Sequence, residues 1–378
     1  MKTSSNILLV ILVILILFTL GALKSINSKI NSIEEKVSDQ GRKISTLYGY
    51  VDTQIGLEKA AEQNEQEKEL GLKAVNGFGD AQYMSKAKFH PQKSLFAVLA
   101  GDGTVHLIDA RSKEKMLMLR IPDEITNAFA FLYDGRSMVL GTKSGKLYQA
   151  DLQTGRSVFL KEFGKREVAR LDAGRNGRVA VGLGGSFEDS KEANSGFVYD
   201  LQTQKILSEY AAFFRDDFQG IAISPSGDVV AIDEVNGKAR GSCLFNASDG
   251  GEIKLCYHQK YGCGPLSVDV APDNKTMATG YAPYHVIVWN TDDASVKWLF
   301  DGHSNWVVSL DFSDDGRYLA SGAGDSTARV YDLQNGKEIG MVRFPGSSTY
   351  VDSVDISSDG SLLLAAVDGF VGIYEMPQ

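Results

Sequence analysis

A repeat of 42 to 49 residues constrains the fold of this 378-residue chain more than any other feature. The stretch Gly302–Leu333, GHSNWVVSLDFSDDGRYLASGAGDSTARVYDL, reads as strand, turn, strand, turn, strand. Its turn has counterparts along the chain, and the closing polar residue of its last strand recurs as Asp109, Asp151, Asp200, Asn246, Asn290, Asp332 and Glu375. Seven such units with short alternating strands predict an all-β propeller of seven four-stranded blades.

The unit also resembles the WD-repeat family, through Gly302-His303, the turn SDDG and the strand ending VYDL. The resemblance covers about Ala74 to the C-terminus. In that family a buried network joins the His of Gly-His, a strand Ser or Thr, a loop Asp and a Trp. Blade six matches with His303, Ser321 and Asp325, whereas Tyr331 stands where the Trp would be. The resemblance implies a structural rather than catalytic role for these four residues.

Closure of the ring can be predicted from the last unit, VGIYEMPQ, which supplies only the third strand of its blade. When Phe89 is aligned with Phe312, Ala74–Phe78 falls opposite Lys297–Asp301, which is an outer strand. We therefore expect Ala74–Phe78 to complete the last blade and remove the open sheet edge.

The N-terminal segment predicts a membrane anchor over residues 1–24. No charged side chain occurs between Thr3 and Leu23, and as a helix this segment reaches about 31 Å, the thickness of the hydrocarbon core of a bilayer. A cleaved signal peptide is the alternative. Cleavage after Ala22 would place Leu20 where a small residue is preferred, so we favour the uncleaved anchor.

Two arguments from the sequence give opposite orientations for this anchor. Lys24, Lys29 and Lys36 follow the segment, and a count of lysines favours a cytoplasmic C-terminus. A signal-anchor with a short basic leader favours the opposite side, and we adopt this single-pass orientation, with the propeller extracytoplasmic.

A heptad pattern follows the anchor and predicts a coiled coil over 25–56. Its "a" and "d" positions are Leu23, Ile26, Ile30, Ile33, Val37, Gln40, Ile44, Leu47 and Val51. Isoleucine at both kinds of position favours trimers or tetramers over dimers, so we expect homo-oligomerisation. The alternative is a single amphipathic helix. A polar linker is predicted over 57–72, and the propeller over 73–378.

Charge and composition limit the partners. The net charge of −9 argues against a nucleic-acid surface, which needs clustered Lys and Arg. The five histidines lack ligand spacing, apart from His258, which follows Cys256 by two residues. No third zinc ligand accompanies this pair, and no cofactor is expected. Cys243 and Cys256 flank a hairpin centred near Asp249-Gly250, which would set them directly opposite and within range of a disulfide. Two buried thiols are the alternative.

Aspartates recur at one position of the innermost strands. Asp172, Asp269, Asp311 and Asp355 share it, and Lys88 occupies it in the first blade. If Asp269, Asp311 and Asp355 face the central channel, they could hold a cation, as in a metal-dependent propeller hydrolase. Carboxylates that are solvated or paired are the alternative.

The main functional hypothesis is a non-catalytic, membrane-tethered scaffold that binds another protein. Tyr83, Trp306 and Tyr350 lie just before the innermost strands of neighbouring blades, and a long loop in Leu183–Ser195 falls on the same rim. Exposed aromatic clusters are typical anchors of protein interfaces. The competing hypotheses are the metal hydrolase and a periplasmic-type assembly scaffold built on the coiled coil.

Overall fold

The computed structural model describes residues 72–79, 84–164, 166–184, 195–211, 220–236, 239–256, 265–281, 284–344, 350–367 and 369–377. The predicted anchor and coiled coil, nearly all of the predicted linker, Tyr83 and most of the long loop in Leu183–Ser195 lie outside these residues. Within them, no helix is long and apolar enough to cross a membrane.

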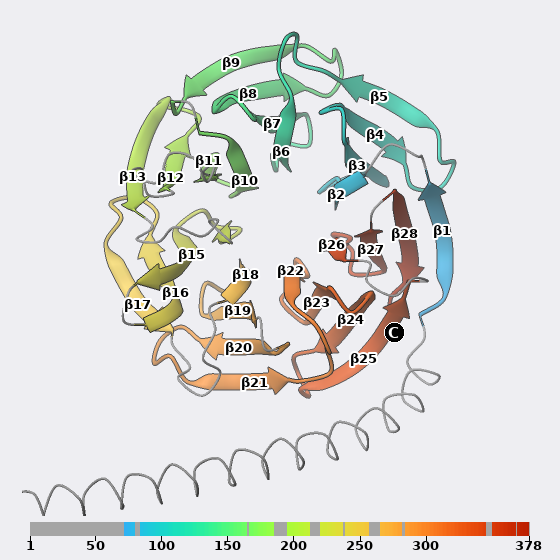
Figure 1. The fold of residues 1–378 in the computed structure, drawn as a ribbon, viewed down its shortest axis with the longest axis vertical. Coiled ribbons are helices and arrows are strands. Elements are labelled where there is room, and N and C mark those ends of the chain that lie inside the picture. The colour runs from blue at the N-terminus through green and yellow to red at the C-terminus, as the bar shows by residue number, and fades with distance from the viewer. Residues whose placement is uncertain are drawn as a thin grey trace, which may run out of the picture. The chain divides into compact units, whose positions relative to one another are not determined.

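Twenty-eight strands of the described residues form seven four-stranded antiparallel sheets, which follow one another around a ring (Figure 1). The prediction of a seven-bladed all-β propeller is therefore confirmed. Blades one to three comprise β2 (Met84–Phe89), β3 (Leu95–Ala100), β4 (Val105–Asp109), β5 (Lys115–Leu119); β6 (Thr126–Phe131), β7 (Ser137–Thr142), β8 (Lys146–Asp151), β9 (Ser157–Glu162); and β10 (Val168–Ala173), β11 (Arg178–Leu183), β12 (Ser195–Asp200), β13 (Lys205–Ala211).

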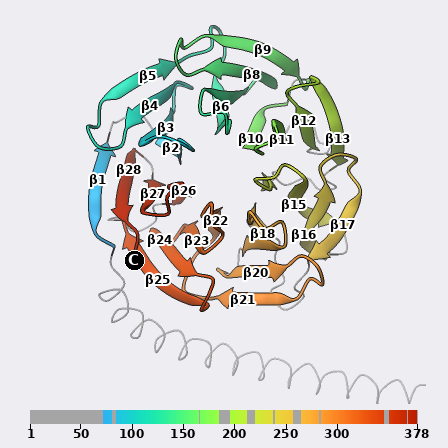
Figure 2. The same ribbon diagram turned by 180° about the vertical axis from the view of Figure 1, so that it is seen from behind.

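The first strand of each blade is innermost and the fourth is outermost, so that β5, β9, β13, β17, β21 and β25 run along the circumference (Figure 2). Blades four to seven comprise β14 (Ile221–Ile223), β15 (Val229–Asn236), β16 (Ala239–Asn246), β17 (Glu252–Cys256); β18 (Pro265–Val270), β19 (Thr276–Tyr281), β20 (Val286–Asn290), β21 (Val296–Phe300); β22 (Val307–Phe312), β23 (Tyr318–Ala323), β24 (Thr327–Asp332), β25 (Lys337–Arg343); and β26 (Val351–Ile356), β27 (Leu362–Val367), β28 (Phe370–Glu375) with β1 (Ala74–Gly79).

Strand β1 closes the ring as the sequence predicts. It pairs antiparallel with β28, with Ala74 opposite Tyr374 and Gly79 opposite Phe370. The first described strand is thereby the outer strand of the last blade, where the two ends of the colour scale meet in Figure 1.

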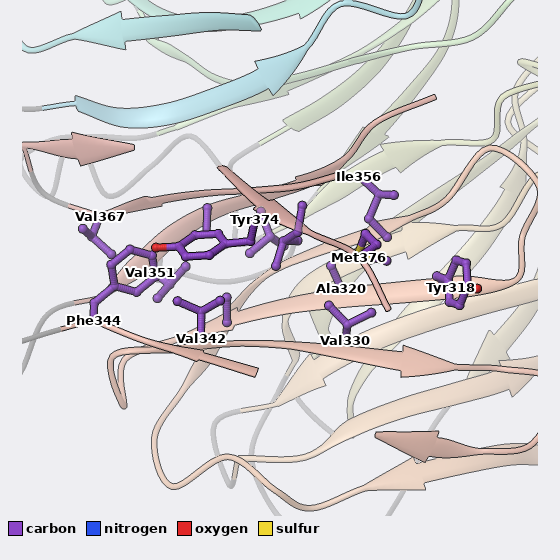
Figure 3. Packing of buried hydrophobic residues seen from close by; sticks show 14 residues of the cluster. Tyr318, Ala320, Val330, Val342, Phe344, Val351, Ile356, Val367, Tyr374 and Met376 are labelled. Carbon is purple, nitrogen blue, oxygen red and sulfur yellow. The ribbon is translucent and has the colours of Figure 1, made fainter. Parts of the chain in front are cut away.

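The hydrophobic core of the described residues consists of seven clusters, one at each seam between consecutive blades. Side chains of a strand alternate between its two faces, so each inner strand contributes to two seams. In β27, Leu363 and Ala365 pack against blade six, whereas Leu364 and Ala366 pack against blade one. Figure 3 shows the seam between blades six and seven, where Tyr374 lies close to Phe344.

The two rims of the ring differ in which connections they carry. The lower rim holds the turns between first and second strands, such as 313–316, and the register of β1 places Leu72 there too. The upper rim holds the loops between blades, such as 301–306, and those between second and third strands, such as 324–326.

The predicted pairing of the cysteines is wrong by one residue. Cys256 lies opposite Ser242, and Leu255 lies opposite Cys243, because a bulge between Leu244 and Phe245 shifts the register of β16 and β17. Consecutive strand residues point to opposite faces, so Cys243 does not share a face with the position paired to Cys256. Cys243 itself is buried.

Candidate functional site

Trp306 and Tyr350 both lie next to Gly324 at the upper rim, Trp306 through its backbone carbonyl and Tyr350 through its ring. The amide N of Gly324 donates to the carbonyl O of Trp306 at 2.9 Å. The ring of Tyr350 covers the other side, where a Cβ added at Gly324 would lie 2.6 Å from its Cε1. The indole of Trp306 remains 47% exposed, while Tyr350 is half-buried. The structure thus brings two of the three predicted aromatic residues together at one point of the rim.

Beneath this rim, the four residues of the predicted blade-six network also meet. His303 Nδ1 lies 3.0 Å from Asp325 Oδ2, and His303 Nε2 lies 2.7 Å from Ser321 Oγ. The hydroxyl of Tyr331 lies 3.2 Å from Ser321 Oγ, in place of the absent indole donor. Sequence reasoning missed Thr327, which donates its hydroxyl proton to Asp325 Oδ1 at 2.6 Å.

The network has the Ser–His–Asp order of a nucleophilic triad, but Ser321 is 0% exposed and no substrate can reach it. Burial lowers the pKa of His303, and the hydrogen bond with Asp325 only partly offsets this effect. Burial alone would raise the pKa of Asp325, but its hydrogen bond with His303 holds that pKa well below its usual range. These groups tie the loop 301–306 to the loop 324–326.

The four aspartates of the innermost strands link consecutive blades around the channel. In each case, the carboxylate Oδ2 accepts a hydrogen bond from a backbone N–H of the next blade, at the start of its lower-rim turn. The acceptor–donor pairs are Asp172 and Ile223 at 2.9 Å, Asp269 and Phe312 at 2.8 Å, Asp311 and Ile356 at 2.8 Å, and Asp355 and Phe89 at 2.7 Å. We call these four contacts the blade latches.

Lys88 supplies the positive charge among these carboxylates. Its Nζ lies 4.0 Å from Asp172 Oδ1. Burial acts to lower the pKa of Lys88, but Asp172, Asp355, Asp311 and Asp269 outweigh it and raise that pKa. Burial also raises the pKa of Asp269 to about 7 and that of Asp355 to about 6.

The metal hypothesis for Asp269, Asp311 and Asp355 gains no support from this geometry. In the described part of the chain, no three His, Cys, Asp or Glu side chains are arranged to hold a metal ion. One oxygen of each carboxylate already accepts a backbone hydrogen bond, and the ammonium of Lys88 offsets part of their negative charge.

An ion pair crosses the lower mouth of the channel. Arg175 from the turn of blade three reaches Asp314 in the turn of blade six, with 3.3 Å between Nη2 and Oδ1. The Arg175 guanidinium also stands 5.1 Å from the ring centroid of Tyr133. The side chains of Arg175 and Asp314 stay 52% and 33% exposed, so this pair adds little stability.

Two cations, Lys86 and Arg170, line a pocket at the upper end of the channel, together with Asp352. Sequence reasoning missed these two cations. They lie two residues before Lys88 and Asp172, on the same face of their strands. The spacing of two residues from Lys88 and from Asp172 was the sequence feature that could have identified Lys86 and Arg170 as channel residues.

Comparison with known proteins accounts for this architecture. The family model "WD domain, G-beta repeat" matches residues 295–332 and 339–375, which run from β21 to β28. The described domain is a seven-bladed β-propeller whose last blades contain segments similar to WD repeats. Each matched segment contains one outer strand followed by the first three strands of the next blade, as expected for a ring whose units interlock.

Relatives with curated descriptions are distant. A ciliary WD repeat-containing protein of Euplotoides octocarinatus is 23% identical over 64% of this chain and 38% of its own length. A WD repeat-containing protein of Schistosoma mansoni is 29% identical over 37% of this chain and 44% of its own. A U3 snoRNP-associated protein-like protein of Arabidopsis thaliana is 23% identical over 50% of this chain and 42% of its own.

The chain thus spans less than half the length of these relatives. Proteins with WD-repeat propellers are typically non-enzymatic scaffolds that bind protein partners. The rim and the channel are therefore best considered as binding surfaces.

Proposed function

We propose that this protein is a membrane-tethered scaffold whose propeller binds a protein partner at the upper rim. The observation that carries the proposal is the exposed indole of Trp306, held beside Tyr350 at Gly324. Aromatic side chains of this kind dominate the energetics of protein interfaces. The loops around them are anchored by the His303 network and by rigid sheets.

The direction of the tether supports the same surface. Leu72, the first described residue, lies at the lower rim, on the side of the propeller away from Trp306. The uncharged stretch from Thr3 to Leu23 would hold the chain in the membrane, with the propeller on the extracytoplasmic side. The heptads of 25–56 would join copies of the chain, so that several upper rims face the same direction.

Site-specific crosslinking of the full-length protein in membranes tests the surface. A photoreactive phenylalanine analogue is placed at Trp306, and in a control at Phe159, an exposed aromatic residue on the outer strand β9. We expect a distinct crosslinked protein from position 306 that Tyr350→Ala weakens. Identical products from positions 306 and 159 would show that the upper rim is not a specific binding surface.

A further inference from the structure

The upper-end pocket contains the partly buried ammonium of Lys86, whose hydrogen bonds go only to neutral groups. Lys86 extends from blade one across the neighbouring blades and donates to the carbonyl oxygens of Asn127, at 2.8 Å, and Ala169, at 3.0 Å. Among the described residues, no carboxylate lies in ion-pair contact with its Nζ. This contrasts with Lys88, which is surrounded by four aspartates two positions further along the same strand.

The charged groups near Lys86 do not supply enough negative charge to compensate the positive charge of its ammonium. Burial lowers the pKa of Lys86 to about 7, and the positive charge of Arg170 lowers it further. Glu167 and Asp352 act in the opposite direction but do not offset these two effects. A buried charge in this situation is stabilised by an added counter-charge.

We propose that the space around Lys86, which we call the Lys86 pocket, is a subsite for a single carboxylate group. The hydroxyl of Ser309 lines the same pocket. It accepts the N–H of Val354 at 3.0 Å, which leaves its own proton to donate to a ligand. Lys86 and Ser309 together offer an ammonium and a hydroxyl to one oxyanion, and the positive charge of Arg170 lies nearby.

The surrounding charges favour a monoanion over a dianion such as phosphate. Glu167 and Asp352 flank the cations, and the ring of aspartates lies directly below, so a second negative charge would meet repulsion. A carboxylate supplies the single negative counter-charge that the ammonium of Lys86 lacks.

The position of the pocket indicates the source of the carboxylate. Val308 lines the pocket two residues after Trp306, so a segment docked on Trp306 can place an acidic side chain in it. This assignment of the source to a protein partner rests on the proposed function, whereas the subsite itself does not.

Thermal unfolding of the full-length protein tests the subsite without any partner. The melting temperature is compared in sodium acetate, sodium phosphate and sodium chloride of equal ionic strength, near pH 6.5. A ligand that binds only the folded state raises the melting temperature, here by about 2 °C in acetate relative to chloride. We expect Lys86→Met to abolish this shift, and Lys93→Met, which changes an exposed lysine of the lower rim, to retain it.

Two results would overturn the proposal. One is an equal acetate shift in the wild type and Lys86→Met, and the other is a larger shift in phosphate than in acetate. Should Lys86→Met fail to fold, the wild type is compared near pH 6 and pH 9, because deprotonation of Lys86 must remove the shift at the higher pH. A shift that is equal at both values excludes Lys86 as the binding group. Loss of crosslinking at Trp306 with an intact acetate shift would refute only the protein partner.

Discussion

At the scale of single residues, tyrosines take the position of the expected tryptophan in blades three, six and seven, and the outcomes in blades three and six differ. Tyr331 in blade six is fully buried, and its hydroxyl reaches Ser321. Tyr199 in blade three is also buried, but its hydroxyl has no hydrogen-bond partner among the described residues. Blade five keeps the tryptophan, and Trp289 donates to Thr279 at 2.8 Å.

These two tyrosines make a matched pair of substitutions. Tyr331→Phe should lower the free energy of unfolding by about 0.5–1.5 kcal/mol, because a satisfied buried hydrogen bond is lost. Tyr199→Phe should leave it unchanged or raise it, because an unpaired buried hydroxyl is removed. Urea unfolding of the two variants checks this. A larger loss for Tyr199→Phe would mean that its hydroxyl is bonded in solution.

His303 should make the stability of the propeller depend on pH. Its pKa is lowered by burial, so between that value and the unfolded value near 6.5 the unfolded chain binds a proton that the folded chain does not. The stability that the neutral imidazole contributes is therefore present above about pH 6.5 and is lost as the pH falls below it.

The test is the stability difference between the wild type and His303→Gln. This difference should shrink when urea unfolding is repeated near pH 5.5 instead of pH 7.5, by at most about 1.4 kcal/mol per pH unit. Because His90 also has a pKa lowered by burial, His90→Gln serves as an independent comparison. A difference that stays constant or grows towards acid would contradict the neutral, buried state of His303.

At the scale of elements, the recurring polar residue at the end of each third strand has a clear physical task. In the turns to the fourth strand its side-chain oxygen accepts backbone N–H groups, as Asp151 does from Gln153 and Thr154. The residue four positions further on has a positive φ. It is glycine in some blades, such as Gly155 with a φ of 70°, but Gln204 in blade three, with a φ of 55°.

This difference predicts opposite effects of two substitutions in equivalent turns. Gln204→Gly should raise the free energy of unfolding by about 0.5 kcal/mol, because glycine adopts positive φ without the steric cost of a Cβ. Gly155→Ala should lower it by about 1 kcal/mol for the same reason. Gln204 is exposed, and a Cβ at position 155 would lie 3.3 Å from Leu117 Cδ1, so at position 155 this contact adds to the backbone effect. Thermal or urea unfolding measures both variants. Changes of the same sign in both variants would exclude this explanation.

The turns and strands could be predicted from the sequence because both are local patterns, and β1 could be placed by aligning one blade with another. The register of Cys256 could not, because the bulge at Leu244 adds a residue without any sequence signal. The three network residues with His303 followed from a family motif. The partners of Lys86 did not, because Asn127 and Ala169 offer backbone carbonyls, which every residue has.

At the scale of the whole molecule, the blade latches are distributed unevenly around the ring. They join blades three to four, five to six, six to seven and seven to one. The latch position holds Lys88 in blade one, Ala130 in blade two and Ala222 in blade four, so the seams that follow these blades have no aspartate at this position. The channel side of the ring is therefore reinforced mainly around blades five to seven.

Removal of one latch should loosen one seam. Asp311→Ala leaves the buried N–H of Ile356 without its acceptor, at a cost of about 1–3 kcal/mol. Hydrogen exchange of the Ile356 amide should then be faster by about tenfold or more, while that of Phe89, held by Asp355, serves as the internal control. Equal acceleration at Phe89 and Ile356 would show that the latches act on global stability and not seam by seam.

The closing strand β1 also determines how the propeller responds to mechanical force. A pull at Leu72 along the circumference acts along the axis of β1, because this outer strand runs along the edge of the ring beside β28 (Figure 1). The hydrogen bonds between β1 and β28 lie across that direction, so they are loaded together in shear and do not open one after another. A ring closed by its outermost strand in this way resists tension that is applied along that strand at Leu72.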